Sequence, residues 1–491
     1  MKKLSTQIVI GLGLSASLFA VEPVSGKLPP PPADGKMPPP PPGAKPPTAP
    51  AAGQAQAQNA GVPPKDGTKP PAPPAPPAGA PAGAPPAGAP PAPPAPPAGA
   101  PPKDGMRPPG PGVGQQGKPG ELRDRNGRPA PAALPGISAE QLVTFLDGLD
   151  DFVKEETPET GLGPIFNDVS CVACHSAGGA GGAGRKTVVR FGRITDGVFD
   201  PLTELGGSLL QKRSISRDFL EHIPKEANVM SLRITTPLFG AGLIEAIPDA
   251  TILANVDLPK TDGVKGRAAM IKDPVSGEMR VGRFGWKAQH ASLLGFSADA
   301  YLNEMGITNR FFPTENAPNG DKALLAKADK FSDPEDVEDP VTKRADIDRV
   351  ASFMQLLAPL PPGPSNDKVK AGAVVFEQVG CVQCHIPKMT TGPDGIAGTK
   401  SQTVALYSDL LLHDMGALGD GIAQPPATMK EMRTSPLWGL RARDRYLHDG
   451  RASTVDLAIR AHDGESKTIR ERYQALPADK RQALLEFLKS I

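Results

Sequence analysis

The sequence predicts a mainly α-helical body of two domains with long loops, preceded by a disordered tether rich in Pro, Ala and Gly. Three observations support this prediction. Prolines are concentrated at the N-terminus, where 39 of the 61 lie before Ile137. Beyond that point apolar residues recur at helical spacing, whereas the strict alternation typical of strands is scarce. The roughly 355 residues after the tether are enough for two domains of ordinary size.

The N-terminus has the pattern of a secretory signal over residues 1–20. Lys2 and Lys3 precede a short apolar run from Ile8 to Phe19, which is too short to span a bilayer comfortably. An uncleaved N-terminal anchor is the alternative. We expect the body to be exported, for example to the periplasm.

Residues 21–135 form the predicted tether. They contain no Phe, Trp or Tyr, so they cannot bury enough apolar surface to offset the entropy of ordering. Repeated Pro-Pro-Ala units favour extended polyproline II segments. We expect a spacer that tethers the body to a membrane or wall, with a peptide-docking role as the alternative.

The charge is balanced, with 54 Lys and Arg against 53 Asp and Glu. A polyanionic partner such as nucleic acid is therefore not expected. No stretch beyond the N-terminal apolar run has the composition of a membrane span.

Helices are expected where apolar stripes follow capping residues. The first begins after Ser138, which forms a capping box with Gln141. Further helices are expected over residues 345–357, 368–379 and 454–462, and from 478 to the end. The Pro-rich stretch at 359–362 ends the second of these helices. We therefore place the domain boundary there, giving domains over residues 136–362 and 363–491.

All four cysteines fall in two copies of one pattern, Cys171-Val-Ala-Cys174-His175 and Cys381-Val-Gln-Cys384-His385. Cys-x-x-Cys-His is the attachment signature of c-type haem. Two thiols three residues apart reach both vinyl groups on one haem edge, and the adjacent His binds the iron. The sequence thus predicts two covalently bound haems in two cytochrome c-type domains.

Redox disulfides and a shared four-thiolate zinc site are the two alternative interpretations of the cysteine pairs. A redox pair does not require His at the next position in both copies. The pairs of a zinc ribbon lie some tens of residues apart at most, whereas these lie about two hundred apart. Haem attachment is the interpretation that explains both copies.

A second ligand for the C-terminal haem is suggested by the short helix that Thr454 caps. Val455, Ala458, Ile459 and His462 share one helical face, so His462 lies on the apolar side. A His in that position is often an ordinary core residue. Because a haem needs a sixth ligand, we favour ligation by His462.

Several long runs in both halves of the body carry a family resemblance. They are Gly161-Leu-Gly-Pro-Ile-Phe-Asn, Arg283-Phe-Gly-Trp-Lys-Ala-Gln, Asn303-Glu-Met-Gly-Ile-Thr-Asn, Tyr407-Ser-Asp-Leu-Leu-Leu-His-Asp-Met-Gly, Arg433-Thr-Ser-Pro-Leu-Trp-Gly-Leu and Tyr446-Leu-His-Asp-Gly-Arg. With these runs, residues 160–490 resemble the bacterial di-haem oxidoreductases, a thiol-oxidoreductase-like family of suspected peroxidases. This family is related to the di-haem cytochrome c peroxidases.

The resemblance implies roles for particular residues. In the peroxidases the distal ligand of the C-terminal haem lies fourteen residues after the His of a His-x-Gly motif, and here that spacing leads from His448 to His462. Trp286 matches a Trp that carries electrons between the haems, with core packing as the alternative. Glu304 matches a Glu that helps cleave peroxide, with a surface or capping carboxylate as the alternative.

By resemblance, the protein is an enzyme that reduces hydrogen peroxide or oxygen at the N-terminal haem. A small redox protein would supply electrons through the C-terminal haem. The alternatives are a non-catalytic electron-transfer cytochrome and a di-haem oxygenase or protein-modifying oxidase of the same fold.

Two positions depart from the family pattern. Phe296 stands ten residues after Trp286, where many di-haem peroxidases have Gln. An apolar residue there disfavours heterolytic cleavage of peroxide and suits oxygen or another substrate. The resemblance also implies a calcium ion between the haems, but Thr235 stands where the family has Asn, and this weakens the expectation of calcium.

Overall fold

The computed structural model describes residues 130–491. The predicted signal and residues 21–129 of the predicted tether lie outside the described residues. Residues 130–135 belong to the folded body, because Ala133 pairs with Leu357 and the Leu134 side chain is buried. The predicted tether is therefore too long at its C-terminal end.

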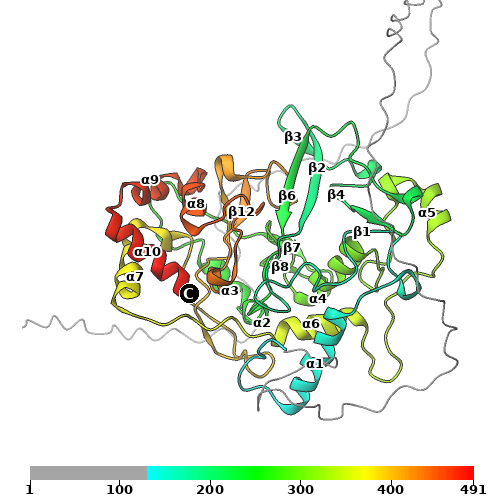
Figure 1. Cartoon of the computed structure of the whole chain (residues 1–491), viewed down its shortest axis with the longest axis horizontal. Coiled ribbons are helices and arrows are strands. Elements are labelled where there is room, and N and C mark those ends of the chain that lie inside the picture. Colours follow the sequence, from blue (N-terminus) through cyan, green and yellow to red (C-terminus); the bar gives the residue numbers. More distant parts are fainter. Residues whose placement is uncertain (1–129) are drawn as a thin grey trace, which may run out of the picture. The chain divides into compact units, whose positions relative to one another are not determined.

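The α-helices are distributed along the described residues, and those of the C-terminal part, α7 to α10, lie together on one side (Figure 1). They are α1 (Ala139–Val153), α2 (Ala241–Glu245), α3 (Asp249–Ala254), α4 (Leu293–Ala300), α5 (Lys322–Ala328), α6 (Asp346–Leu356), α7 (Asp367–Val379), α8 (Val455–Arg460), α9 (Lys467–Ala475) and α10 (Ala478–Ser490). The five predicted helices correspond to α1, α6, α7, α8 and α10. Among the described residues, no helix combines the length and apolar character needed to cross a bilayer.

Strands are more frequent than the sequence suggested. They are β1 (Ile165–Phe166), β2 (Thr187–Thr195), β3 (Val198–Asp200), β4 (Leu209–Leu210), β5 (Arg213–Ser214), β6 (Val229–Ile234), β7 (Met270–Lys272), β8 (Met279–Val281), β9 (Met389–Thr390), β10 (Thr403–Val404), β11 (Leu412–Asp414) and β12 (Glu431–Arg433). The longest strand, β2, pairs antiparallel with β3, β4 and β6. The prediction of a mainly α body is thus met only in part.

Two pairs of helices pack closely against each other, and a glycine lies where the two helices of each pair cross. In the first pair α1 packs against α6, where the Phe152 and Phe353 rings lie 4.8 Å apart. A Cβ atom at Gly148 would collide with the carbonyl oxygen of Arg349. In the second pair α7 packs against α10, and a Cβ at Gly372 would collide with the Ala483 backbone. Each glycine therefore lets two helix backbones approach closely.

The buried side chains form two main cores. The first centres on α1, α4 and α6, and it also includes Leu410, Leu411 and Trp438 from the C-terminal part of the chain. The second centres on α7, α9 and α10. The predicted boundary at 362/363 lies in the segment between α6 and α7, and its role as a domain boundary stays a prediction.

Candidate functional site

Each Cys-x-x-Cys-His motif lines its own cavity. The N-terminal pocket is lined by Cys171, Cys174 and His175. The C-terminal pocket is lined by the second motif. The four thiols are free, and the two pairs line different cavities. A single zinc site shared by all four thiols is therefore excluded.

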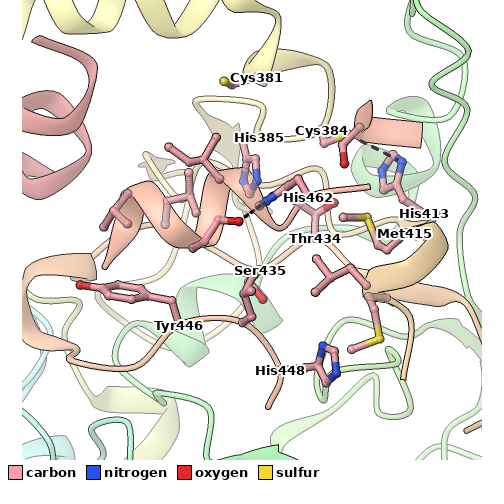
Figure 2. Close-up of a pocket in the computed structure, with 18 of the residues that line it drawn as sticks. Cys381, Cys384, His385, His413, Met415, Thr434, Ser435, Tyr446, His448 and His462 are labelled. Carbon is pink, nitrogen blue, oxygen red and sulfur yellow. Dashed lines mark hydrogen bonds between the residues drawn. The ribbon is translucent and has the colours of Figure 1, made fainter. Parts of the chain in front are cut away.

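The C-terminal pocket brings together two histidines that were predicted as iron ligands. Helix α7 ends at Gly380, and a short turn then places His385 with its Nδ1 atom 2.9 Å from the carbonyl oxygen of Tyr407. His462 follows α8, and its Nδ1 atom lies 2.8 Å from the carbonyl oxygen of Ala458. Figure 2 shows both imidazoles in the same pocket as the two cysteines.

These contacts fix the tautomer of both rings. A carbonyl oxygen accepts a hydrogen bond from a protonated Nδ1, so Nε2 of each ring keeps its lone pair. Burial lowers the pKa of His385 to about 4 and also lowers the pKa of His462, so both rings are neutral at pH 7. A neutral imidazole with a free Nε2 is the form that binds a metal.

The N-terminal pocket also presents a neutral imidazole, that of His175, although its Nδ1 atom has no hydrogen-bond partner. The backbone nitrogen of His175 donates to the carbonyl oxygen of Cys171 at 2.9 Å, which closes the turn of the motif. Its ring packs 6.1 Å from the ring of Phe152. Burial lowers the pKa of His175 to about 4, so this ring is also neutral at pH 7.

Glu304 faces the N-terminal pocket from an irregular turn. Helix α4 continues into one turn of π-helix, Tyr301–Met305, a feature that is frequent at functional sites. The Glu304 carboxylate accepts a hydrogen bond from Nδ2 of Asn167 at 2.9 Å. Burial raises the pKa of Glu304 to about 7, although the Arg190 cation and the Asn167 hydrogen bond oppose the shift. Glu304 can therefore both bind and release a proton near neutral pH.

Phe296 and His290 form an aromatic patch in the same pocket. Their rings stack with centroids 4.9 Å apart, and Phe296 also stacks on Phe284 at 6.2 Å. Nε2 of His290 lies 3.4 Å from a carboxylate oxygen of Asp299. Phe296 thus contributes an apolar wall to the pocket that contains Glu304.

Trp286 lines both pockets. Its Nε1 atom donates a hydrogen bond to the carbonyl oxygen of Ile234 at 2.9 Å, and its ring meets His448 edge-on at 6.3 Å. The next residue, Lys287, is fully buried and forms an ion pair with Asp420, which also pairs with Arg233. Trp286 is therefore held firmly in a wall that the two cavities share.

Residues 210–491 match the sequence profile of a family described as "Di-haem oxidoreductase, putative peroxidase". The chain belongs to this family. Its members are oxidoreductases that use two haems, and this confirms the resemblance noted in the sequence.

Similar solved structures include hydrazine synthase of Kuenenia stuttgartiensis, at 16% identity and a TM-score of 0.36, covering 80% of this chain and 100% of that chain. A MauG-like protein associated with microbial copper homeostasis matches at 13% identity, with 74% and 92% covered and a TM-score of 0.34. The di-haem peroxidase BthA of Burkholderia thailandensis matches at 13% identity, with 52% and 78% covered and a TM-score of 0.26. No curated protein sequence matched the chain.

The pockets of this di-haem oxidoreductase fit the cofactor that the family uses. Each offers a neutral His and two free thiols that line the same cavity. Each also contains a half-buried arginine whose Nε atom is buried without a hydrogen-bond partner, Arg190 in the N-terminal pocket and Arg443 in the C-terminal pocket. Such arginines suit the carboxylate groups of a haem.

Sequence reasoning missed Arg190 and Arg443 because a basic residue alone carries no signal of burial. Arg433 also lines the C-terminal pocket, but its guanidinium donates to the backbone oxygens of Gly285 and Thr434. Arg451 lies outside the lining of both pockets and pairs with Asp449.

Proposed function

We propose that this chain is an exported di-haem c-type oxidoreductase that reduces hydrogen peroxide in the N-terminal pocket, with electrons relayed from the C-terminal pocket. The observation that carries the proposal is the position of Glu304. It is a half-buried carboxylate in a cavity that shares Trp286 with the second cavity, and partial burial raises its pKa to about 7.

The residues that would hold the two haems follow from the pocket linings. Cys171 and Cys174 would form thioether bonds in the N-terminal pocket, with His175 as iron ligand. Cys381 and Cys384 would do so in the C-terminal pocket, with His385 and His462 as the two iron ligands. When bound, the haems supply redox-active iron centres that bind and reduce peroxide and store electrons.

Glu304 supplies the proton chemistry. Peroxide must lose one proton and the departing oxygen must gain one, and a single carboxyl group with a pKa near 7 can do both. The Nδ2 atom of Asn167 donates to one carboxylate oxygen, which orients Glu304 in the pocket. Trp286 provides an aromatic path between the pockets.

The C-terminal pocket is the proposed entry point for electrons. Two nitrogen ligands lower the reduction potential of a haem relative to a His and Met pair. A small redox protein is the expected donor. Covalent haem attachment takes place in an exported compartment, which agrees with the signal pattern of residues 1–20.

Phe296 favours a second candidate function. Its stack with His290 makes part of the N-terminal pocket apolar where many di-haem peroxidases have Gln. An apolar wall suits dioxygen, so an oxygenase or a protein-modifying oxidase is the second candidate. Analysis of the reaction products separates it from a peroxidase.

The test is steady-state peroxide turnover of wild type and Glu304→Gln as a function of pH. Glu304 acts first as a base and its pKa lies near 7, so kcat/KM should rise as the pH increases through about 7. Glu304→Gln should abolish this rise and reduce kcat/KM on the order of a hundredfold.

The matched control is Glu278→Gln, which removes an exposed carboxylate that lines neither pocket. It should leave turnover unchanged. Cyanide and carbon monoxide titrations should show one haem that binds these ligands and one that does not. Two haems that ignore every ligand in both oxidation states would instead indicate an electron carrier and exclude the peroxidase.

A further inference from the structure

We propose that Glu315, Asp333 and Glu335 bind a calcium ion, at a site that lies outside both pockets and does not involve Thr235. One carboxylate oxygen from each residue lies within 4.8 Å of the other two. None of the three residues lines the N-terminal or the C-terminal pocket. The site belongs to the long segment between the turn that carries Glu304 and helix α6.

Two of the three carboxylates, Asp333 and Glu335, are held by Thr308, which is fully buried. The Thr308 hydroxyl donates to a carboxylate oxygen of Asp333 at 2.7 Å and also contacts Glu335. The Thr308 backbone nitrogen donates to the same oxygen of Glu335 at 2.7 Å. These bonds fix two of the carboxylates in place and leave their other oxygens available.

Glu315 is the residue that points to a missing ligand. Its residue surface is only 7% exposed. One carboxylate oxygen accepts a hydrogen bond from the backbone nitrogen of Asn316 at 3.0 Å. The other oxygen, Oε2, is buried and has no hydrogen-bond partner. A buried carboxylate oxygen without a donor or cation is costly, so this oxygen requires a partner that the chain does not provide.

No cationic side chain serves as that partner. Within the described part of the chain, no Lys, Arg or His forms an ion pair with Glu315, Asp333 or Glu335, and the ion pairs there involve other carboxylates. Burial, followed by the charges of Glu335 and Asp333, raises the pKa of Glu315 to about 9. A proton on Glu315 is therefore the competing occupant, and the experiment must separate a proton from a metal ion.

The ligand chemistry favours calcium among the common divalent ions. All of the ligands are oxygens, which suit a hard cation rather than zinc or copper. Calcium binds oxygens at 2.3–2.6 Å, so ligands on opposite sides of the ion lie up to about 5 Å apart, whereas magnesium requires a tighter octahedron. Asp333 is exposed, so water can complete the coordination shell.

A cation at this site would stabilise the segment that supports the N-terminal pocket. Thr308 lies four residues after Glu304, and Asp333 and Glu335 are bonded to Thr308. Bound calcium would connect Asp333 and Glu335 to Glu315 and so hold the later part of this segment against its earlier part. This inference concerns stability and does not depend on the proposed peroxidase activity.

The test uses the full-length, haem-loaded protein after removal of metals with a chelator. Calcium chloride is titrated by calorimetry, and thermal unfolding is followed with and without calcium. Wild type should bind calcium and gain thermal stability. Glu315→Gln should weaken calcium binding at least tenfold and lose the calcium-dependent gain in thermal stability. Asp333→Asn should also weaken calcium binding.

The control is Glu338→Gln, which makes the same charge change at an exposed position of the same loop. It should bind calcium within twofold of wild type. The haem absorption spectrum verifies that each variant is folded. Absence of calcium binding by wild type, equal binding by Glu315→Gln and Glu338→Gln, or a preference for magnesium would each overturn the assignment. If Glu315→Gln raised the thermal stability of the protein and calcium had no effect on wild type, the group that neutralises Glu315 would be a proton.

Discussion

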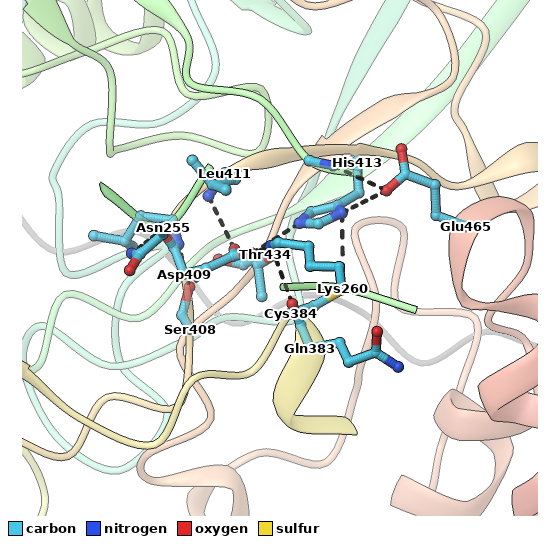
Figure 3. A network of polar contacts seen from close by, with 12 residues as sticks. Asn255, Lys260, Gln383, Cys384, Ser408, Asp409, Leu411, His413, Thr434 and Glu465 are labelled. Carbon is cyan, nitrogen blue, oxygen red and sulfur yellow. Dashed lines mark hydrogen bonds and ion pairs between the residues drawn. The ribbon is translucent and has the colours of Figure 1, made fainter. Parts of the chain in front are cut away.

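At the scale of single residues, His413 lies between two carboxylates (Figure 3). Its Nε2 atom is 2.9 Å from Asp409, and its Nδ1 atom is 2.8 Å from Glu465. Burial disfavours the charged ring, but hydrogen bonds to Asp409, Cys384 and Glu465 outweigh burial and raise the pKa of His413 to about 12. Lys260 pairs with the same Asp409 carboxylate at 3.2 Å. His413 is therefore a buried imidazolium in the folded protein.

This charge makes the stability of the protein depend on pH. The unfolded His has a pKa of about 6.5, so the contribution of His413 is fully present below that pH and declines as the pH rises towards 12. His413→Gln should lower the unfolding free energy by about 3 kcal/mol at pH 6, because it breaks a buried ionic network. The loss should be smaller at pH 9. Urea unfolding at both pH values measures this difference.

The control for His413→Gln is His222→Gln, which changes an exposed histidine outside both pockets. It should leave the unfolding free energy nearly unchanged at both pH values. A loss for His413→Gln that is the same at pH 6 and pH 9 would show that the ring is not charged in the folded state.

At the scale of elements, the short helix α8 depends on its cap. The Thr454 hydroxyl accepts a hydrogen bond from the Leu457 backbone nitrogen at 3.1 Å, and α8 has only six residues. Thr454→Ala should lower the unfolding free energy by about 1 kcal/mol. It should also loosen His462, whose ring is held by Ala458 of the same helix. The low-spin fraction of the C-terminal haem, measured by electron paramagnetic resonance, should fall.

Ser138→Ala provides a matched control, since Ser138 caps α1 through the Gln141 backbone nitrogen. It should cost a similar free energy of unfolding and leave the spectrum of the C-terminal haem unchanged. Equal spectra for the two cap variants would argue against His462 as an iron ligand.

The elements that could be predicted are those whose signals are local. The cap at Ser138 and the bounds of α6, α7 and α10 were expected within a few residues, because stripes and capping residues lie within each helix. Strand β2 was missed because its pairing is not local: Thr187 meets Ile234, far along the chain. Leu134 was assigned to the tether for the same reason, since its partner Leu356 lies in α6.

The residues of the candidate site also differ in whether a local sequence signal could predict them. The two haem motifs are contiguous, so their residues could be named from spacing alone. Glu304 and Trp286 were named through resemblance, and their roles stay predictions. Arg190, Arg443 and the Glu315 site were not anticipated, because each owes its significance to burial among residues that are distant in sequence.

At the scale of the whole molecule, the two pockets meet at Trp286, and the proposed relay depends on this shared wall. The chain has only two tryptophans, and the other one, Trp438, is buried in the first core and lines neither pocket. Trp286→Phe keeps a ring at the position but removes the hydrogen bond from Nε1 to Ile234. Trp438→Phe makes the same chemical change at a distance from the relay.

The measurement is the rate at which electrons pass between the haems, followed by stopped-flow absorption after one haem is reduced. Trp286→Phe should slow this transfer on the order of tenfold, which corresponds to about 1.4 kcal/mol added to the barrier. Trp438→Phe should change the rate of electron transfer by less than Trp286→Phe does. Both variants lose stability through the same kind of substitution. Equal transfer rates in the two variants would mean that electrons cross by another route, and Trp286 would then be a packing residue of the shared wall.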